Sequence, residues 1–182
     1  MALNATVHAF EVALSDSDRN VYGALEFRVA RHPSESAEYL LTRVLAYCLE
    51  YAEGLEFSSG GLSDPDAPAL AIRDLTGQLR SWIEVGRPEP ARLHKAAKTA
   101  PRVAVYAHRD VGPWLERVAA EPVHRLDAIE IYTIERALLT ALAARLERRM
   151  RFDLAVSGRE LYLSLADTTL SGGVAGHRIS RT

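Results

Sequence analysis

The sequence predicts an α/β (α+β) fold in which a mixed central β-sheet is flanked by helices. Short runs rich in β-branched and aromatic residues recur along the chain and are bounded by glycine, proline, asparagine or aspartate, which is typical of strands. Stretches with apolar residues three and four apart lie between them and predict helices. Strand pairs are expected at both ends of the chain and strand–helix–strand units in the middle, where parallel neighbours are favoured.

Each element is predicted from its periodicity and its boundaries. Ser34 is expected to cap the first helix, and Pro88 is expected in the first turn of the second. In chain order, the sequence predicts strands at 3–14 and 21–31, a helix at 34–52, a loop at 53–68, strands at 69–73 and 79–85, a helix at 91–99, a strand at 103–107, a helix at 111–119, a strand at 128–133, a helix at 134–148, and strands at 152–156 and 161–165.

Length and composition are those of an ordinary soluble protein. The chain has 182 residues, 48% of them apolar and 25% charged, which fits a single domain over residues 1–170 followed by a flexible glycine-rich tail at 171–182. The single Cys48 excludes an internal disulfide and suits a reducing compartment. No signal-peptide pattern and no apolar run of about 20 residues is seen, so we expect a cytoplasmic protein without a membrane span.

The charge balance restricts the choice of partners. The net charge is −2 and the six histidines are scattered, without zinc-ligand spacing. No global positive field draws nucleic acid or an anionic membrane to the protein, so contact with DNA or RNA would need a local basic patch. The sequence does not predict the oligomeric state.

Two acids on the second predicted hairpin are the first candidates for a site. Asp74 follows one strand, and Glu84 stands within the apolar run from Trp82 to Val85 of the next. If the strand register brings the two carboxylates together, they would suit Mg²⁺ or Mn²⁺, which take oxygen ligands and promote phosphoryl chemistry. The alternative is a turn aspartate and an edge-strand glutamate that are simply solvated.

A lysine is expected to complete this site from the following helix. Metal-dependent nucleases often carry Lys two positions after the second acid, but here that position is Gly86. Lys95 lies on the next predicted helix and would stabilise charge in the transition state, while Arg92, Lys98 and Arg87 would bind backbone phosphates. An exposed helix with a solvated basic face explains the same pattern.

Glu38, on the first predicted helix, is the candidate for a third carboxylate. It shares a helical strip with Leu41 and Leu45 and is expected to tilt inward, whereas Glu35 is expected to interact with the helix dipole. Glu38 could instead pair with Arg31 or Arg43.

Several separated blocks of the sequence together resemble the YaeQ family over nearly the whole chain. They are Arg31-His32-Pro33-Ser34-Glu35-x-x-Glu38, Arg43-x-Leu45-Ala46-Tyr47, Trp82-Ile83-Glu84-Val85-Gly86-x-Pro88 and Arg92-Leu93-x-Lys95-Ala96. The resemblance implies a variant of the PD-(D/E)xK nuclease fold, with a restriction-endonuclease-like core. In it Asp74 and Glu84 would face the metal, Glu38 would be the helix carboxylate, and the basic residue would have moved from the strand to Lys95 on the helix.

Two functions follow from these observations. The first is a metal-dependent nuclease or phosphodiesterase in which Asp74, Glu84, Lys95 and Glu38 are catalytic and Asp74 and Glu84 hold Mg²⁺ or Mn²⁺. The second is a non-catalytic module that retains the fold and binds nucleic acid or protein. Gly86 in the usual lysine position and the mild net acidity favour the second.

Overall fold

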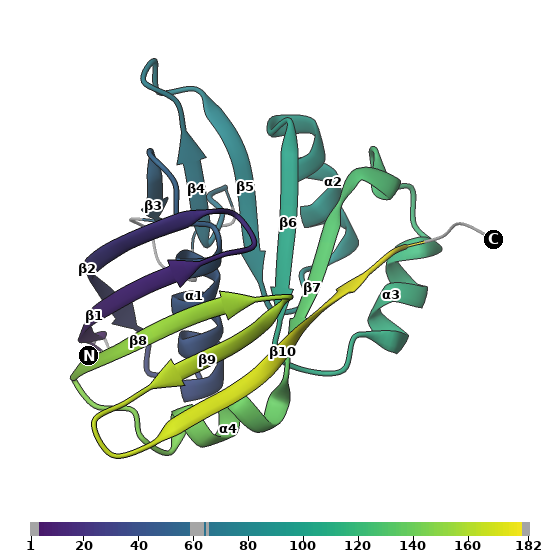
Figure 1. The fold of residues 1–182 in the computed structure, drawn as a ribbon. Helices are drawn as coiled ribbons and strands as arrows, with labels where there is room; N and C mark the ends of the chain where they lie inside the picture. The colour runs from purple at the N-terminus through teal and green to yellow at the C-terminus, as the bar shows by residue number, and fades with distance from the viewer. Residues whose placement is uncertain (1–3, 59–63, 65, 180–182) are drawn as a thin grey trace. The chain divides into compact units, whose positions relative to one another are not determined.

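The computed structural model describes residues 4–58, 64 and 66–179. Over these residues the chain forms a mixed α+β fold with ten strands and four α-helices (Figure 1). The chain divides into two compact units: unit 1 comprises Met1–Leu49 and Ile134–Ala175, and unit 2 comprises Glu50–Thr133 and Gly176–Thr182. A single domain over residues 1–170 stays a prediction from sequence.

Unit 1 combines five strands, in the spatial order β2-β1-β8-β9-β10, with two helices that pack against each other. Strand β1 pairs antiparallel with β2 and parallel with β8, and the pairs β8–β9 and β9–β10 are antiparallel. The elements are β1 (Thr6–Asp16), β2 (Val21–Arg31), α1 (Ala37–Leu49), α4 (Arg136–Ala143), β8 (Arg149–Ser157), β9 (Glu160–Ser164) and β10 (Thr169–His177).

The alternation of side chains along the strands decides which face of the unit 1 sheet is buried. In β8, Met150, Phe152, Leu154 and Val156 are buried and every intervening residue is exposed. Strand β1 alternates in the same way, so its odd-numbered residues lie on the outer face. One face of this sheet therefore contributes to the core, and the other is available for contact with ligands.

Unit 2 has the strand order β7-β6-β5-β4-β3. The pairs β3–β4 and β4–β5 are antiparallel, and β5–β6 and β6–β7 are the parallel pairs expected from the strand–helix–strand units. Residues from β5, β6, β7, α2 and α3 share one core that contains both tryptophans, Trp82 and Trp114. The elements are β3 (Leu55–Phe57), β4 (Leu70–Arg73), β5 (Leu79–Val85), α2 (Pro90–Thr99), β6 (Arg102–Ala107), α3 (Gly112–Ala119) and β7 (Glu130–Ile134).

Helix boundaries differ from the sequence prediction in three places. Helix α1 is capped by Ser36, whose Oγ accepts the Tyr39 amide at 3.0 Å, because Ser34 is engaged instead with the His32 ring. Helix α2 has Pro90 in its first turn, where Pro88 was expected. Helix α4 ends at Ala143 and not near residue 148, because parallel pairing with β1 draws Arg149 and the residues after it into β8.

Two predicted irregular segments contain strands. The predicted loop at 53–68 includes β3, and residues 59–63 and 65 lie outside the described part. Much of the predicted flexible tail is strand β10, with residues 180–182 again outside the described part. Gly172 is required there for close packing and not for flexibility, because a Cβ at this position would lie 2.7 Å from Leu138 Cβ of α4.

Candidate functional site

Glu84 is a buried carboxylate near the end of β5, on the face of the sheet that packs against α2. Its Oε1 accepts the Trp82 indole N–H at 2.5 Å, which is possible because residues two apart in a strand share a face. Only 5% of the Glu84 side chain is exposed. Burial raises the pKa of Glu84, and the Trp82 hydrogen bond and the charge of Arg92 oppose this shift without cancelling it.

Arg92 links Glu84 to the segment that precedes β4. From the first turn of α2, its Nε donates to Glu84 Oε1 at 2.7 Å and its Nη2 donates to the Ala67 carbonyl at 2.7 Å. The guanidinium carbon lies 5.9 Å from the centre of the Trp82 ring, within the range of a cation–π contact. Arg92 therefore connects the end of β5 with the segment that precedes β4.

Lys95 stands one turn further along α2, and its ammonium pairs with the carboxylate of Asp66. This hydrogen bond is the main reason that the pKa of Asp66 lies below its ordinary value, and the charge of Arg92 lowers it further. The Lys95 and Asp66 side chains remain 48% and 73% exposed. We define the acid–base cluster as Asp66, Glu84, Arg92 and Lys95; it holds two carboxylates and two cations.

The structure does not bring Asp74 into this cluster, because the strand register on which a pairing of Asp74 with Glu84 depended places the two acids at opposite ends of β5. In the hairpin Arg73 lies opposite Leu79, whereas Leu70 lies opposite Ile83. Asp74 therefore sits at the turn, six residues from Glu84 along β5, which corresponds to roughly 20 Å. Its carboxylate accepts hydrogen bonds from Thr76, Gln78 and Arg80, which fix the turn.

Sequence reasoning missed Asp66, although the hairpin geometry contains a signal for it. In an antiparallel hairpin the start of the first strand lies opposite the end of the second. An acid that can meet Glu84 must therefore precede β4 and not follow it, at about the same distance from the Gly77 turn. Continuing the register from Leu70 opposite Ile83 places residue 69 opposite Glu84, and Asp66 stands three residues before it, whereas Asp74 lies at the other end of the hairpin, near the turn.

The backbone at Gly86 explains why no lysine stands there. Gly86 has φ of +95°, a conformation that L-residues with side chains rarely adopt. Its amide donates to the Tyr106 carbonyl at 2.8 Å as the chain leaves β5. The cation that contacts Glu84 comes instead from α2, as Arg92, and Lys95 of the same helix contacts Asp66.

The remaining predicted residues fall into two groups. Lys98 is exposed on α2, and Arg87 is exposed but donates from Nη1 to the Asp110 carbonyl at 3.2 Å. Glu38 belongs to unit 1 and is only half-buried. The buried acid at this end of α1 is Glu35, which pairs with Arg43 at 3.0 Å, so the expected orientations of Glu35 and Glu38 are reversed. A shared site with Glu38 stays a prediction from sequence.

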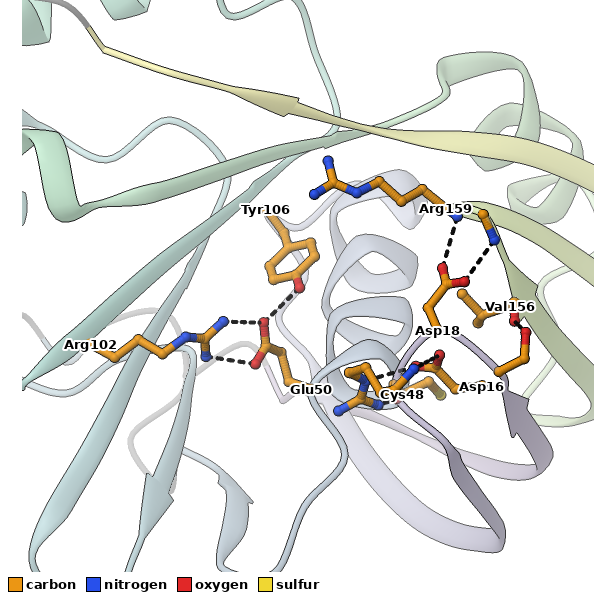
Figure 2. A network of polar contacts seen from close by, with 11 residues as sticks. Asp16, Asp18, Cys48, Glu50, Arg102, Tyr106, Val156 and Arg159 are labelled. Carbon is orange, nitrogen blue, oxygen red and sulfur yellow. Dashed lines mark hydrogen bonds and ion pairs between the residues drawn. The ribbon is translucent and has the colours of Figure 1, made fainter.

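A second charged group in unit 2 has a different character, and Figure 2 shows three of its residues, Arg102, Glu50 and Tyr106. Arg102 donates two hydrogen bonds to Glu50 and two to Glu130, and the hydroxyls of Tyr106 and Tyr132 donate to the same two acids. Burial alone would lower the pKa of Arg102, but the bonds to Glu50 and Glu130 raise it overall. We call these five residues the Arg102 network.

The acid–base cluster contains the type of ligand that a hard divalent ion takes, carboxylate oxygen. Mg²⁺ is commonly held by one or two carboxylates together with substrate phosphates and water, and Asp66 and Glu84 provide two carboxylates beside two cations that can bind phosphate. Within the described residues, no group of three or more His, Cys, Asp and Glu side chains is arranged to hold a metal ion. An ion here would therefore depend on ligands from the substrate.

The fold and the cluster define a class: a small α+β protein with a mixed sheet flanked by helices and an acid–base cluster beside α2. The sequence model described as YaeQ protein matches residues 1–172, so the chain belongs to the YaeQ family. It is 30% identical to the uncharacterized protein YaeQ of Escherichia coli (strain K12) over 167 residues, 90% of this chain and 91% of that protein.

Two crystal structures of YaeQ proteins are similar to this chain over nearly its whole length. The protein from Pseudomonas syringae has a TM-score of 0.88, with 30% identity and 98% of each chain covered. The protein from Xanthomonas axonopodis pv. citri has a TM-score of 0.86 at 30% identity, covering 97% of this chain and 99% of that one. In the described part of this chain, no helix combines the length and apolar character needed to cross a membrane.

Proposed function

We propose that this protein is a metal-dependent phosphodiesterase of nuclease type, a variant of the PD-(D/E)xK plan that its sequence resembles. Asp66 and Glu84 are the metal-facing acids, Lys95 is the displaced amine, and Arg92 and Lys98 bind phosphates. The supporting observation is that Arg92 and Lys95, one turn apart on α2, contact Glu84 and Asp66 respectively. Asp66 also follows Pro65, which matches the first two letters of the PD-(D/E)xK name.

The charge balance of the acid–base cluster allows it to bind a metal ion and a substrate together. Two carboxylates and two cations neutralise one another in the free protein. A divalent cation and two substrate phosphates add equal and opposite charge, so metal and substrate are expected to bind together. Arg92 and Lys95 then turn from the carboxylates to the phosphates, a small movement for Lys95 because it is half exposed.

The reaction requires a water to attack phosphorus, with one ester P–O bond broken and a proton delivered to the leaving alkoxide. A metal ion held by Asp66 and Glu84 would supply Lewis-acid polarisation of the phosphoryl oxygen. Lys95 stabilises the charge that develops on the phosphoryl group, and Arg92 holds the phosphate in position. Trp82 orients Glu84 through its indole N–H, which leaves the second carboxylate oxygen for other ligands.

The test compares Asp66 with Asp74. Purified wild-type protein and the variants Asp66→Asn, Glu84→Gln, Lys95→Met and Asp74→Asn are incubated with single- and double-stranded DNA and RNA and Mn²⁺. The first three are expected to lose cleavage by about 100-fold or more. Asp74→Asn is the matched control and should retain activity. Cleavage that is equal in all variants, or lost only in Asp74→Asn, would overturn the proposal.

One observation favours the second candidate, a non-catalytic module that binds nucleic acid or protein. Both acids of the cluster are already ion-paired, and Glu84 is also held by Trp82, which is how a structural carboxylate is satisfied. Calorimetric titration with Mn²⁺ in the presence of an uncleavable phosphorothioate oligonucleotide distinguishes the two. Oligonucleotide binding that is independent of Mn²⁺ and unchanged in Glu84→Gln would favour the module.

A further inference from the structure

The outer face of the unit 1 sheet carries a hollow that the proposed activity does not use. It has a volume of about 470 Å³ and lies over three adjacent strands, β2, β1 and β8. This volume falls within the roughly 300–1,000 Å³ typical of small-molecule sites. The lining comprises residues 9–11, 26–28 and 149–151, and all of them belong to unit 1.

Strand register places two arginines on either side of a small residue in this hollow. Ala9 lies opposite Arg28 in β2 and opposite Arg149 in β8, so the three side chains form one row across the sheet. With strands about 4.8 Å apart, the two arginine Cα atoms are separated by roughly 10 Å, a gap that two guanidinium groups can close around one anion. The Ala9 methyl between them leaves the space open.

Neither arginine is committed to a partner by the fold. Arg28 and Arg149 are exposed, and none of the ion pairs found among the described residues involves them. Arg151 in the adjacent row lies 4.0 Å from Glu11, a long and exposed contact that contributes little to stability. All three guanidinium groups can therefore turn toward a ligand.

The neighbouring row has the complementary chemistry. Glu26 lies directly opposite Glu11, and like charges opposite each other destabilise a sheet. These carboxylates stand two residues, or roughly 7 Å, along the strands from the Arg28–Ala9–Arg149 row. They can accept hydrogen bonds from hydroxyl groups attached to an anion that is held by the arginines. Counting the three arginines, the hollow has a net charge of +1 in a chain whose net charge is −2.

We propose that this hollow binds a small phosphate ester, with its phosphate between Arg28 and Arg149 and its hydroxyl groups toward Glu11 and Glu26. Guanidinium groups match phosphate oxygens in both charge and planar hydrogen-bond geometry, which gives the phosphate end its preference. The facing glutamates disfavour ligands with negative charge at both ends. The site lies in unit 1 and does not depend on the acid–base cluster of unit 2.

The experiment is an NMR titration of the ¹⁵N-labelled full chain with inorganic phosphate and, separately, ribose 5-phosphate, at constant ionic strength set by chloride. The amide signals of Ala9, Arg28 and Arg149 are expected to shift saturably, with ribose 5-phosphate binding more tightly than phosphate. Glu26→Gln should remove this difference while leaving phosphate binding in place. If wild type binds phosphate and ribose 5-phosphate with equal affinity, the site recognises only the phosphate group, and the proposed role of Glu11 and Glu26 is wrong.

Matched variants test the geometry without changing the core. The Arg28→Gln/Arg149→Gln double variant should weaken phosphate binding by about tenfold or more, and Ala9→Leu should weaken it comparably by filling the hollow. The Arg109→Gln/Arg145→Gln double variant removes the same charge at exposed positions outside the hollow, and Ala13→Leu adds the same volume on the same strand face; both should bind as wild type. Shifts that do not saturate, or that persist in Ala9→Leu and the double variant, would overturn the proposal.

Discussion

The two charged groups of unit 2 use the same residue types to different ends. In the Arg102 network, one guanidinium makes bidentate contacts with Glu50 and Glu130, and two tyrosine hydroxyls donate to the same acids. In the acid–base cluster, Glu84 is buried, Lys95 is half exposed and Asp66 is mostly exposed. Protein donors satisfy both acids of the first group, whereas the second group has one buried acid and one exposed ion pair.

The exposure of a charged side chain decides whether it can exchange its partner for a ligand. A buried carboxylate with several protein donors loses much if one donor is removed, because no water can replace it. An exposed pair exchanges its partner for water, a phosphate or a cation at little cost. We therefore assign stability to the Arg102 network and ligand exchange to the exposed Asp66–Lys95 pair of the acid–base cluster, and four predictions test the properties of the two groups.

The largest expected effect is the removal of Arg102. Arg102→Met should lower the free energy of unfolding by about 3 kcal/mol, because it leaves the buried Glu50 and its neighbour Glu130 without their shared cation. Urea unfolding followed by circular dichroism measures this change. The control is Arg109→Met, an exposed arginine outside both groups. If Arg102→Met lowers the free energy of unfolding by less than Arg109→Met does, the Arg102 network has no stabilising role.

The next effect concerns one donor of the same network. Tyr106 is buried, and its hydroxyl donates to Glu50 at 2.6 Å. Tyr106→Phe should therefore lower the free energy of unfolding by about 2 kcal/mol, the range for a hydrogen bond to a charged group. Tyr132→Phe is the matched comparison, since its 3.0 Å bond to Glu130 is only partly buried, and it should cost less. Equal costs, measured by the same unfolding curves, would contradict the role given to burial.

The third prediction concerns which position can supply the catalytic amine, Lys95 on α2 or a lysine placed at Gly86. Because Gly86 has a positive φ, Gly86→Lys should lower the free energy of unfolding by about 1 kcal/mol. It should also fail to restore Mn²⁺-dependent cleavage in a Lys95→Met background. Gly158→Lys, at another glycine with positive φ, controls for backbone strain alone. Restored cleavage by Gly86→Lys would show that the strand position can provide the amine after all.

The smallest effect is a pH dependence. Burial raises the pKa of Glu84, so the folded state binds its proton more tightly than the unfolded state does. The contribution of Glu84 to stability is then fully present below its unfolded pKa and falls as the pH rises through the folded value. Glu84→Gln should therefore gain stability relative to wild type between pH 4 and pH 7, measured from thermal unfolding across that range. A difference that is constant with pH would contradict the shift.

Much of the fold follows from local pattern. The hairpin β1–β2, the β5-α2-β6-α3-β7 run and the β8–β9 hairpin are predicted from alternation, helical spacing and turn residues. The errors occur where a distant contact overrides the local signal. Pairing with β1 ends α4 early, and packing against Leu138 turns a glycine-rich segment into strand β10.

The candidate site was predicted in part for the same reason. Glu84, Lys95 and Arg92 were identified from their residue types and from an acid placed within an apolar run. Asp74 is the acid that the hairpin pattern and the family resemblance indicate, but the hairpin register places it at the far end of the strands from Glu84. The hollow in unit 1 could not be predicted at all, since residues 9, 28 and 149 meet only across two strand pairs.

Most strands and helices, and the charged side chains that stand within apolar runs, follow from the amino-acid sequence alone; β3, β10 and the end of α4 do not. Those properties depend on the backbone preferences and on the spacing of neighbouring residues. Which charges meet depends on the three-dimensional fold, because register and long-range packing bring Asp66 to Lys95, Arg92 to Glu84, and Arg28 and Arg149 to either side of Ala9.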